Sequence, residues 1–598
     1  MCGIVGYNGS EKESKNILIN GLKKLEYRGY DSAGIALKEN NNITITKEKG
    51  KIKNLEEKLD NTTTTLGIGH TRWATHGEPN EINSHPHQVG EITIVHNGII
   101  ENYKELKEEL IKNNYNFKSE TDTEVACALI DYLYKQEKDI KKALSKFIDK
   151  VKGAYALGIL VNNDNNLYSI RKDCPLVIGK GNIGNLIASD ILAIADYVDE
   201  IIYLEENTIA EISNKEIKLY NKKLKEIKPI FKKIPQGEYT TDKCGYEHYM
   251  LKEIHEQPKV FKNTTDKYVQ NGTESILKEM PDFKKYNKIH VVACGSAYHT
   301  GLVGKNLIEE YANIPVEVEI ASEYRYKKNF YDENTLLIVV SQSGETADTL
   351  AALRKAKNDN IDTLAIVNVG NSTIAREAKY VLKTEAGPEI AVATTKAYSA
   401  QVATFGLIAL NIALEKNNIK KEEVTQILKE IKELPIQIEN TINNCNYKEI
   451  ANSIYERDDI FFIGRGIDYA LCMEGSLKLK EISYIHSQAY AAGELKHGTI
   501  SLVENNTPVI GIITEEQLKD KTISNIEEVK SRGAKTIIIT NDNEIKNYDH
   551  ITYLPKVHKM LQPLLTVLPL QLISYEVARL RNCDIDKPKN LAKSVTVE

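Results

Sequence analysis

The chain has 598 residues, more than one hydrophobic core usually serves, so several domains are expected. Hydrophobic residues make up 41% and charged residues 27%, as is ordinary for a globular protein. The formal net charge of -6 argues against a nucleic-acid surface, and we expect no nucleic-acid partner.

Targeting and membrane signals are absent from the sequence pattern. The start, Met1-Cys2-Gly3-Ile4, shows no basic region followed by an apolar run. The most apolar candidate for a membrane span, Ile187 to Leu204, is broken by acidic residues. The eight cysteines are scattered without metal-ligand spacing. We therefore expect a cytoplasmic protein with no membrane partner, no metal and no cofactor.

The first part of the chain mixes short strands with amphipathic helices. Predicted strands are 43–46, 91–95, 154–161 and 209–212, and predicted helices include 102–112 and 123–134. This mixture indicates a layered α/β domain over residues 1–235. Turn-forming residues 235–239 then predict a linker, and we assign 236–284 to the linker and a connecting helix.

From about residue 285, buried-type strands alternate with helices, which is typical of a parallel sheet. The predicted strands are 289–293, 336–340, 363–367, 460–463, 509–513 and 536–539. The strand and glycine turn at Ile289–Ser296 recur at Ile460–Gly466, which indicates a duplicated domain. We expect two α/β subdomains, 285–444 and 445–585, joined by a helical stretch within 400–444, and a tail, 586–598.

Cys2 is the sharpest chemical feature of the sequence. If Met1 is removed, Cys2 carries a thiol and a free α-amine, whose pKa lies near ~8, so one residue supplies nucleophile and base. A lone Met-Cys start more often has no role. Its context consists of the segments 70–77, 83–87, 95–102 and 119–124. Taken singly, Asn97-Gly98 predicts a hairpin turn that ends a strand, and Ser119–Glu124 predicts a helix N-cap.

Together with Tyr27–Gly34, these segments resemble the glutaminase domain of the N-terminal-nucleophile amidotransferases. The resemblance implies an αββα sandwich with Cys2 as nucleophile. It implies that Asn97 and the Gly98 N–H form the oxyanion hole. It also implies that Arg72 binds the glutamine carboxylate and Asp122 its ammonium group. The implied glutamine-binding set is Arg72, Trp73, Thr75, His76 and Asp122, with Trp73 closing over the ammonia path.

The segment Ser341–Thr346 lies between a predicted strand and a predicted helix. Hydroxyls and backbone N–H groups at a helix N-terminus bind anions, although an ordinary N-cap is an equal alternative. The segment lacks the residues of a Walker motif. It resembles the sugar-isomerase (SIS) domains, and two such domains suit the duplication. The resemblance implies these sugar-phosphate ligands: Ser296, Ser341, Gln342, Ser343, Thr346, Val392, Lys478 and Ala592.

The spacing of four and three residues places Glu474, Lys478 and Glu481 on one face of a predicted helix. Such a face can belong to a catalytic site, or it can be an ordinary solvent-exposed face of ion pairs. Residues 475–484, 492–498 and 591–598 resemble the glucosamine-6-phosphate synthase family. That resemblance implies a homodimer making glucosamine 6-phosphate from fructose 6-phosphate and L-glutamine. It gives Glu481 the proton transfer between C1 and C2, His497 the ring opening in a neighbouring subunit, and Lys593 an imine with the ketose.

Three positions depart from the family pattern, namely Ala297, Thr394 and Lys589. The tail must enter the isomerase pocket, and we expect Leu591 and Val595 to anchor it. Two other functions remain open from the sequence. A phosphoribosyl-diphosphate amidotransferase shares the glutaminase half, but its acidic diphosphate loop is missing. A non-catalytic sugar-phosphate sensor would need neither Cys2 nor Lys593.

Overall fold

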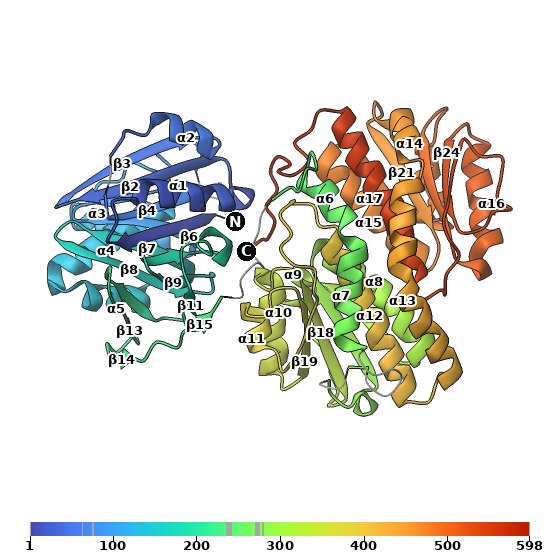
Figure 1. The fold of residues 1–598 in the computed structure, drawn as a ribbon, viewed down its shortest axis with the longest axis horizontal. Helices are drawn as coiled ribbons and strands as arrows, with labels where there is room; N and C mark the ends of the chain where they lie inside the picture. Colours follow the sequence, from blue (N-terminus) through green and yellow to red (C-terminus); the bar gives the residue numbers. More distant parts are fainter. Residues whose placement is uncertain are drawn as a thin grey trace. The chain divides into compact units, whose positions relative to one another are not determined.

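The computed structural model describes residues 2–62, 64–73, 77–234, 242–269, 276–277 and 280–596. The chain separates into two units, residues 1–241 with 592–598, and residues 242–591. Figure 1 colours residues 1–241 from blue to green and the rest of the chain from green to red. The predicted linker at Pro235–Tyr239 lies outside the described residues. Of the range 236–284, residues 249–255 and 257–268 form the helices α6 and α7.

The first unit contains two antiparallel sheets. One sheet has the order β15 (Lys232–Lys233), β11 (Glu200–Tyr203), β9 (Val177–Gly181), β10 (Gly184–Ala188), β1 (Gly3–Gly9), β4 (Leu66–Arg72), β2 (Ser32–Glu39), β3 (Asn42–Lys49). The other has the order β14 (Glu226–Ile227), β13 (Ile217–Tyr220), β12 (Ile209–Ile212), β8 (Asp164–Lys172), β7 (Gly153–Val161), β6 (Ile92–Ile100), β5 (His87–Val89). Alternating apolar residues such as Ile4, Ile68 and Leu160 are buried in the core that the two sheets share.

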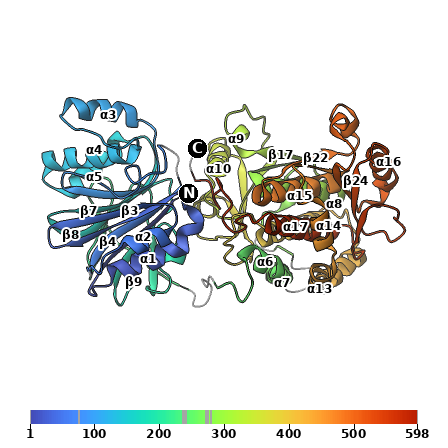
Figure 2. The same cartoon turned by 90° about the horizontal axis from the view of Figure 1, so that it is seen from above.

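Helices cover the outer faces of both sheets. The helices α1 (Ser14–Leu25) and α2 (Ile52–Lys58) pack on the first sheet, and α3 (Tyr103–Lys112), α4 (Asp122–Glu137) and α5 (Ile140–Lys150) pack on the second. Figure 2 shows these two helical layers on opposite sides of the sheets. The predicted αββα sandwich is therefore confirmed.

One local prediction in this unit was wrong. Asn97-Gly98 does not end a strand in a turn, because β6 continues to Ile100 and pairs with β7 as far as Gly153. Gly98 instead has φ +127°, and a Cβ there would lie 2.0 Å from the carbonyl oxygen of Ala154. The glycine serves close packing of two strands, not a chain reversal.

The second unit contains two five-stranded parallel sheets with the same strand order. The first is β17 (Val316–Ile320), β16 (Lys288–Ala293), β18 (Thr335–Ser341), β19 (Asp362–Val367), β20 (Tyr380–Lys383). The second is β22 (His486–Ala491), β21 (Asp459–Gly464), β23 (Pro508–Ile513), β24 (Lys535–Thr540), β25 (His550–Tyr553). This repetition confirms the two predicted parallel-sheet subdomains.

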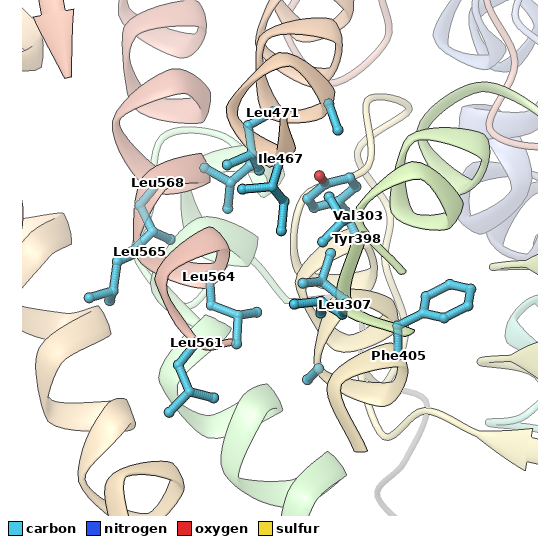
Figure 3. Close-up of a cluster of buried hydrophobic side chains, with 14 of the residues drawn as sticks. Val303, Leu307, Tyr398, Phe405, Ile467, Leu471, Leu561, Leu564, Leu565 and Leu568 are labelled. Carbon is cyan, nitrogen blue, oxygen red and sulfur yellow. The ribbon is translucent and has the colours of Figure 1, made fainter. Parts of the chain in front are cut away.

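The helices of this unit are α6 (Tyr249–His255), α7 (Gln257–Tyr268), α8 (Gly295–Ala312), α9 (Ala321–Tyr324), α10 (Ala347–Asn358), α11 (Thr373–Glu377), α12 (Lys396–Glu415), α13 (Lys421–Asn444), α14 (Tyr447–Ile454), α15 (Ile467–Ser483), α16 (Lys519–Lys530) and α17 (Gln562–Leu580). Figure 3 shows Val303 and Leu307 of α8, Leu471 of α15, and Leu564 and Leu568 of α17 in one cluster. The two subdomains thus share a continuous hydrophobic core.

Among the described residues, the helix that is long and apolar enough to cross a membrane is α12. The range 187–204, the most apolar candidate in the sequence, holds the end of β10 and all of β11. The apolar window of α12 is 94% buried inside the unit, as befits a core helix of a large domain.

Candidate active sites

Cys2 lies immediately before β1, beside the residue that follows β4. Its Sγ accepts the backbone N–H of Trp73 at 3.3 Å and lies 3.6 Å from the Trp73 carbonyl oxygen. Burial raises the pKa of the Cys2 thiol above its ordinary value. A neutral thiol is a weak nucleophile, so the site needs a base that removes its proton.

Asn97 and Gly98 face the nucleophile from β6. The side-chain amide of Asn97 donates from Nδ2 to the Cys2 carbonyl oxygen at 2.9 Å. Its Oδ1 lies 3.1 Å from Nε2 of His70, which also lies 2.9 Å from the His96 carbonyl oxygen. Two acceptors at one ring nitrogen place the proton on Nε2, and this fixes the orientation of the amide.

A cationic and an anionic side chain line the same pocket as Cys2. Arg72 ends β4 and donates to the carbonyl oxygens of Gly77 (3.2 Å) and Glu78 (3.4 Å). Asp122 begins α4 and accepts the Ile100 N–H at 2.8 Å. The pocket lining is Cys2, Arg72, Trp73, His85, His96, Gly98, Thr121, Asp122 and Thr123. A guanidinium, a carboxylate and a thiol in one pocket suit an α-amino acid substrate.

Two predicted glutamine ligands, Thr75 and His76, lie outside the described residues. A feature that the sequence did not predict is a group of four buried histidines, His70, His85, His87 and His96. The rings of His70 and His85 are 4.1 Å apart, and those of His85 and His87 are 5.2 Å apart. Burial lowers the pKa of His70 to about 3 and lowers those of His85 and His87, so these rings are neutral.

The predicted phosphate loop follows β18 in the second unit. The hydroxyl of Ser341 accepts the Gly344 N–H at 3.0 Å and lies 2.9 Å from the hydroxyl of Thr346. The hydroxyl of Ser343 accepts the Glu345 N–H at 3.2 Å. Gly344 has φ +66°, and any Cβ there would collide with Ser372. Hydroxyls and the N-terminus of α10 are therefore gathered in one tight turn, an arrangement that suits an oxyanion.

Lys478 of α15 is almost fully buried between two carboxylates. Its Nζ lies 2.6 Å from Glu481 and 3.5 Å from Glu474. Burial would lower the pKa of Lys478, but the charges of Glu481 and Glu474 outweigh it, and the pKa is raised. Lys478 is therefore an ammonium group suited to charge stabilisation and not to imine formation.

Glu474 joins the two subdomains. Its carboxylate accepts the hydroxyl of Ser296 at 2.9 Å and lies 2.8 Å from Nδ1 of His299, both on α8. The sequence placed Glu474 beside Lys478 on one helix face but gave it no role, and it missed His299. No local pattern could reveal a contact between residues 175 positions apart.

The remaining predicted residues are placed as follows. Val392 is buried, and its N–H donates to the Asp586 carbonyl oxygen at 3.0 Å. His497 is exposed, directly after a short helical turn. Ala592 and Lys593 are half-buried and belong to the first unit. Since Glu481 belongs to the second unit, the meeting of Lys593 with Glu481 stays a prediction.

Val595, an expected anchor of the tail, is 42% exposed, whereas the neighbouring Ser594 and Thr596 are buried. Anchorage of the tail in the isomerase pocket stays a prediction. Two of the three residues that depart from the family pattern, Thr394 and Lys589, contact a neighbouring side chain. The Thr394 hydroxyl donates to Glu389, and the ammonium group of Lys589 lies 4.2 Å from the ring centroid of Tyr484.

One group of side chains has the composition of a metal site. His290 of β16 and Glu317 and Glu319 of β17 bring ligand atoms within 4.8 Å of one another. However, Lys288 pairs with Glu317 at 2.8 Å, and Lys327 pairs with Glu319. The group is an ion-pair cluster on the edge of the first parallel sheet.

Comparison with known proteins gives matches for both units of the chain. A glutamine amidotransferase domain family matches residues 70–196, and the SIS domain family matches residues 282–411 and 453–581. The chain is 51% identical over 612 residues to the glutamine–fructose-6-phosphate aminotransferase (isomerizing) of Clostridium tetani, with both chains fully covered. The namesake of Caldanaerobacter subterraneus is 49% identical over 611 residues, again with full coverage.

Among solved structures, the C-terminal domain of glucosamine-fructose-6-phosphate aminotransferase from Francisella tularensis is 39% identical. It aligns with a TM-score of 0.56 and covers 58% of this chain and 100% of that one.

Proposed function

The chain belongs to the family of isomerizing glutamine–fructose-6-phosphate aminotransferases, and we propose which of its residues carry each half of the reaction. Its substrates are glutamine and fructose 6-phosphate, and its products are glutamate and glucosamine 6-phosphate. Two matched SIS domains beside the glutaminase domain carry this conclusion. The two SIS domains are not explained by a phosphoribosyl-diphosphate amidotransferase, and the relatives, which are named as aminotransferases, favour an enzyme over a non-catalytic sensor.

In the glutaminase half, the Cys2 thiolate attacks the carboxamide carbon of glutamine, and its own α-amine takes the thiol proton once Met1 is removed. Asn97 and the Gly98 N–H bind the oxyanion of the tetrahedral intermediate. Arg72 and Asp122 hold the amino-acid end of glutamine. Collapse of the intermediate releases ammonia and leaves a thioester at Cys2, which water hydrolyses to glutamate. Trp73, Thr75 and His76 complete the glutamine site.

In the isomerase half, the Ser341–Thr346 loop binds the phosphate, supported by Ser296, Val392 and Ala592 around the sugar. His497 of a second copy opens the sugar ring, which requires a homodimer. The side-chain amine of Lys593 attacks the C2 ketone and expels water to give an imine, and ammonia then displaces the lysine. Glu481 moves a proton from C1 to C2, while Lys478 stabilises the charge that develops.

We further propose a cytoplasmic enzyme with the domain limits 1–235, 236–284, 285–444, 445–585 and 586–598. The test of the nucleophile is glutamate release by the purified enzyme, with and without fructose 6-phosphate. Cys2→Ala should abolish glutamate release and leave fructose 6-phosphate binding intact. Glutamate release by Cys2→Ala, or an active enzyme whose intact mass retains Met1, would refute this assignment.

A further inference from the structure

The two SIS subdomains can be aligned residue by residue through their strand pairing. Val291 of β16 pairs with Ile338 of β18, and Phe462 of β21 pairs with Ile510 of β23. β16 ends two residues after Val291, and β21 ends two residues after Phe462. In the same way, α10 begins nine residues after Ile338, and α16 begins nine residues after Ile510. The two halves are thus in register from each first strand to the helix that follows the loop.

This register shows what replaced the phosphate loop in the second subdomain. The equivalents of Ser341–Thr346 are Ile513–Leu518. The hydroxyls of Ser341, Ser343 and Thr346 are replaced by the side chains of Ile513, Glu515 and Leu518. None of these replacements can donate a hydrogen bond to a phosphate at neutral pH.

The same register makes Asp468 of α15 the equivalent of Ala297 of α8. Asp468 is only 2% exposed. Its Oδ2 accepts the backbone N–H groups of Thr514 (2.7 Å) and Glu515 (3.2 Å), and its Oδ1 accepts the Thr514 hydroxyl. A buried carboxylate therefore binds the loop N–H groups that precede α16, as a bound anion would. In the first subdomain Ala297 offers only a methyl group.

The surroundings of the second loop also disfavour an anion. The adjoining pocket is lined by acidic Glu515, Glu516, Asp542 and Glu544. Its lysines are already paired, Lys519 with Asp542 and Lys556 with Glu516, each at 2.8 Å. A second phosphosugar would meet both an occupied anion position and a negative rim.

We propose that Asp468 limits the chain to one phosphosugar site, because its carboxylate takes the anion position that the first subdomain leaves to the sugar phosphate. The residue at this position, Ala297 or Asp468, then acts together with the loop hydroxyls and the charge of the rim to set whether an SIS half of this chain accepts a phosphorylated sugar. The inference rests on the proposed function of the Ser341 loop, so its test must separate the two.

The reciprocal substitution is the sharpest test. In Ala297→Asp, the new carboxylate should bind the first loop and repel the phosphate. Fructose 6-phosphate affinity, measured by calorimetry, should fall more than ~100-fold, because like charges in contact cost several factors of ten. Ala297→Asn is the matched uncharged control and should bind much more tightly than Ala297→Asp. Circular dichroism and thermal unfolding of the full chain report whether the second unit, which contains residue 297, is folded in each variant.

Affinity of Ala297→Asp within tenfold of wild type would overturn the proposal. Ser341→Ala tests the proposed function separately, because unchanged affinity there would show that the loop is not the phosphate site. If Ala297→Asp fails to fold, removal of the carboxylate from the second subdomain tests the proposal instead. Asp468→Ser in a Ser341→Ala background should gain binding of inorganic phosphate over Ser341→Ala alone, and no gain would equally contradict the proposal.

Discussion

Nε2 of His70 lies 3.1 Å from Oδ1 of Asn97, and Nδ2 of the same Asn97 lies 2.9 Å from the backbone oxygen of Cys2. A buried neutral imidazole therefore sets which end of the Asn97 amide faces the nucleophile. Because the oxyanion hole needs a donor there, an amide turned the other way would present an acceptor to the developing negative charge.

His70 should therefore act as a positioning residue for glutamine hydrolysis. We expect His70→Ala to lower kcat for glutamate release by roughly 10–100-fold, less than or equal to the loss in Asn97→Ala. KM for glutamine should change little, because Arg72 and Asp122 are untouched. His70→Gln, which retains an N–H donor, should recover part of the loss. A kcat equal to wild type in His70→Ala would contradict the positioning role.

The buried histidines predict acid sensitivity of the first unit. The pKa of His70 is lowered to about 3, and those of His85 and His87 are also lowered, whereas unfolded histidines titrate near ~6.5. Below that pH the unfolded state binds more protons than the native state. The free energy of unfolding should therefore decrease as pH falls, by at most about 1.4 kcal/mol per pH unit for each histidine.

Urea unfolding between pH 7 and 5, followed by tryptophan fluorescence, measures this effect. The chain has one tryptophan, Trp73, so the signal comes from the first unit alone. His87→Gln should reduce the slope by about one histidine's share. A stability that stays constant from pH 7 to pH 5 would contradict the expected proton uptake on unfolding.

Restoring a hydroxyl at Ala297 should not harm the sugar-phosphate site. Ala297 is half-buried and packs at the rim of the core, where a serine fits without a large change in volume. Ala297→Ser should bind fructose 6-phosphate as tightly as wild type or more tightly, by at most about 1.5–3 kcal/mol for a bond to a charged group. Clearly weaker binding would mean that this turn packs differently from the proposed phosphate site.

Lys593 should form the covalent imine. Lys478 is excluded from this role by its raised pKa and its two carboxylate partners. Borohydride added with fructose 6-phosphate should leave a sugar adduct on Lys593, detectable by peptide mass spectrometry. Lys593→Arg keeps the positive charge but cannot form an imine, so it should lose synthase activity and retain glutaminase activity. An adduct on another lysine would refute the assignment.

The sequence predicted the elements whose signals are local. The three inner strands of each parallel sheet lie where the apolar runs predicted them, and α4 begins after Thr121, within the predicted N-cap segment. The outer strands β17, β20, β22 and β25 were not predicted. The Asn97-Gly98 turn was wrong, because a strong local turn signal was overridden by pairing of β6 with β7. The turn propensity of two residues is outweighed by the pairing of a whole strand with its neighbour in the sheet.

The candidate sites were predicted less completely than the strands. Resemblance supplied Cys2, Arg72 and Asp122, and the structure brings these three to one pocket. It could not supply the contacts of Glu474 with His299 or of Asp468 with Thr514, since both join residues far apart in the chain. Such pairings depend on tertiary packing, which no spacing rule encodes.

Transfer of the glutamine amide nitrogen is the most direct test of the central claim. Purified enzyme is given fructose 6-phosphate and glutamine labelled with ¹⁵N at the side-chain amide, and the products are analysed by mass spectrometry. The result we predict is glucosamine 6-phosphate carrying the label, formed by wild type but by neither Cys2→Ala nor Lys593→Arg. Release of labelled ammonia without labelled glucosamine 6-phosphate from the wild-type enzyme would contradict the claim.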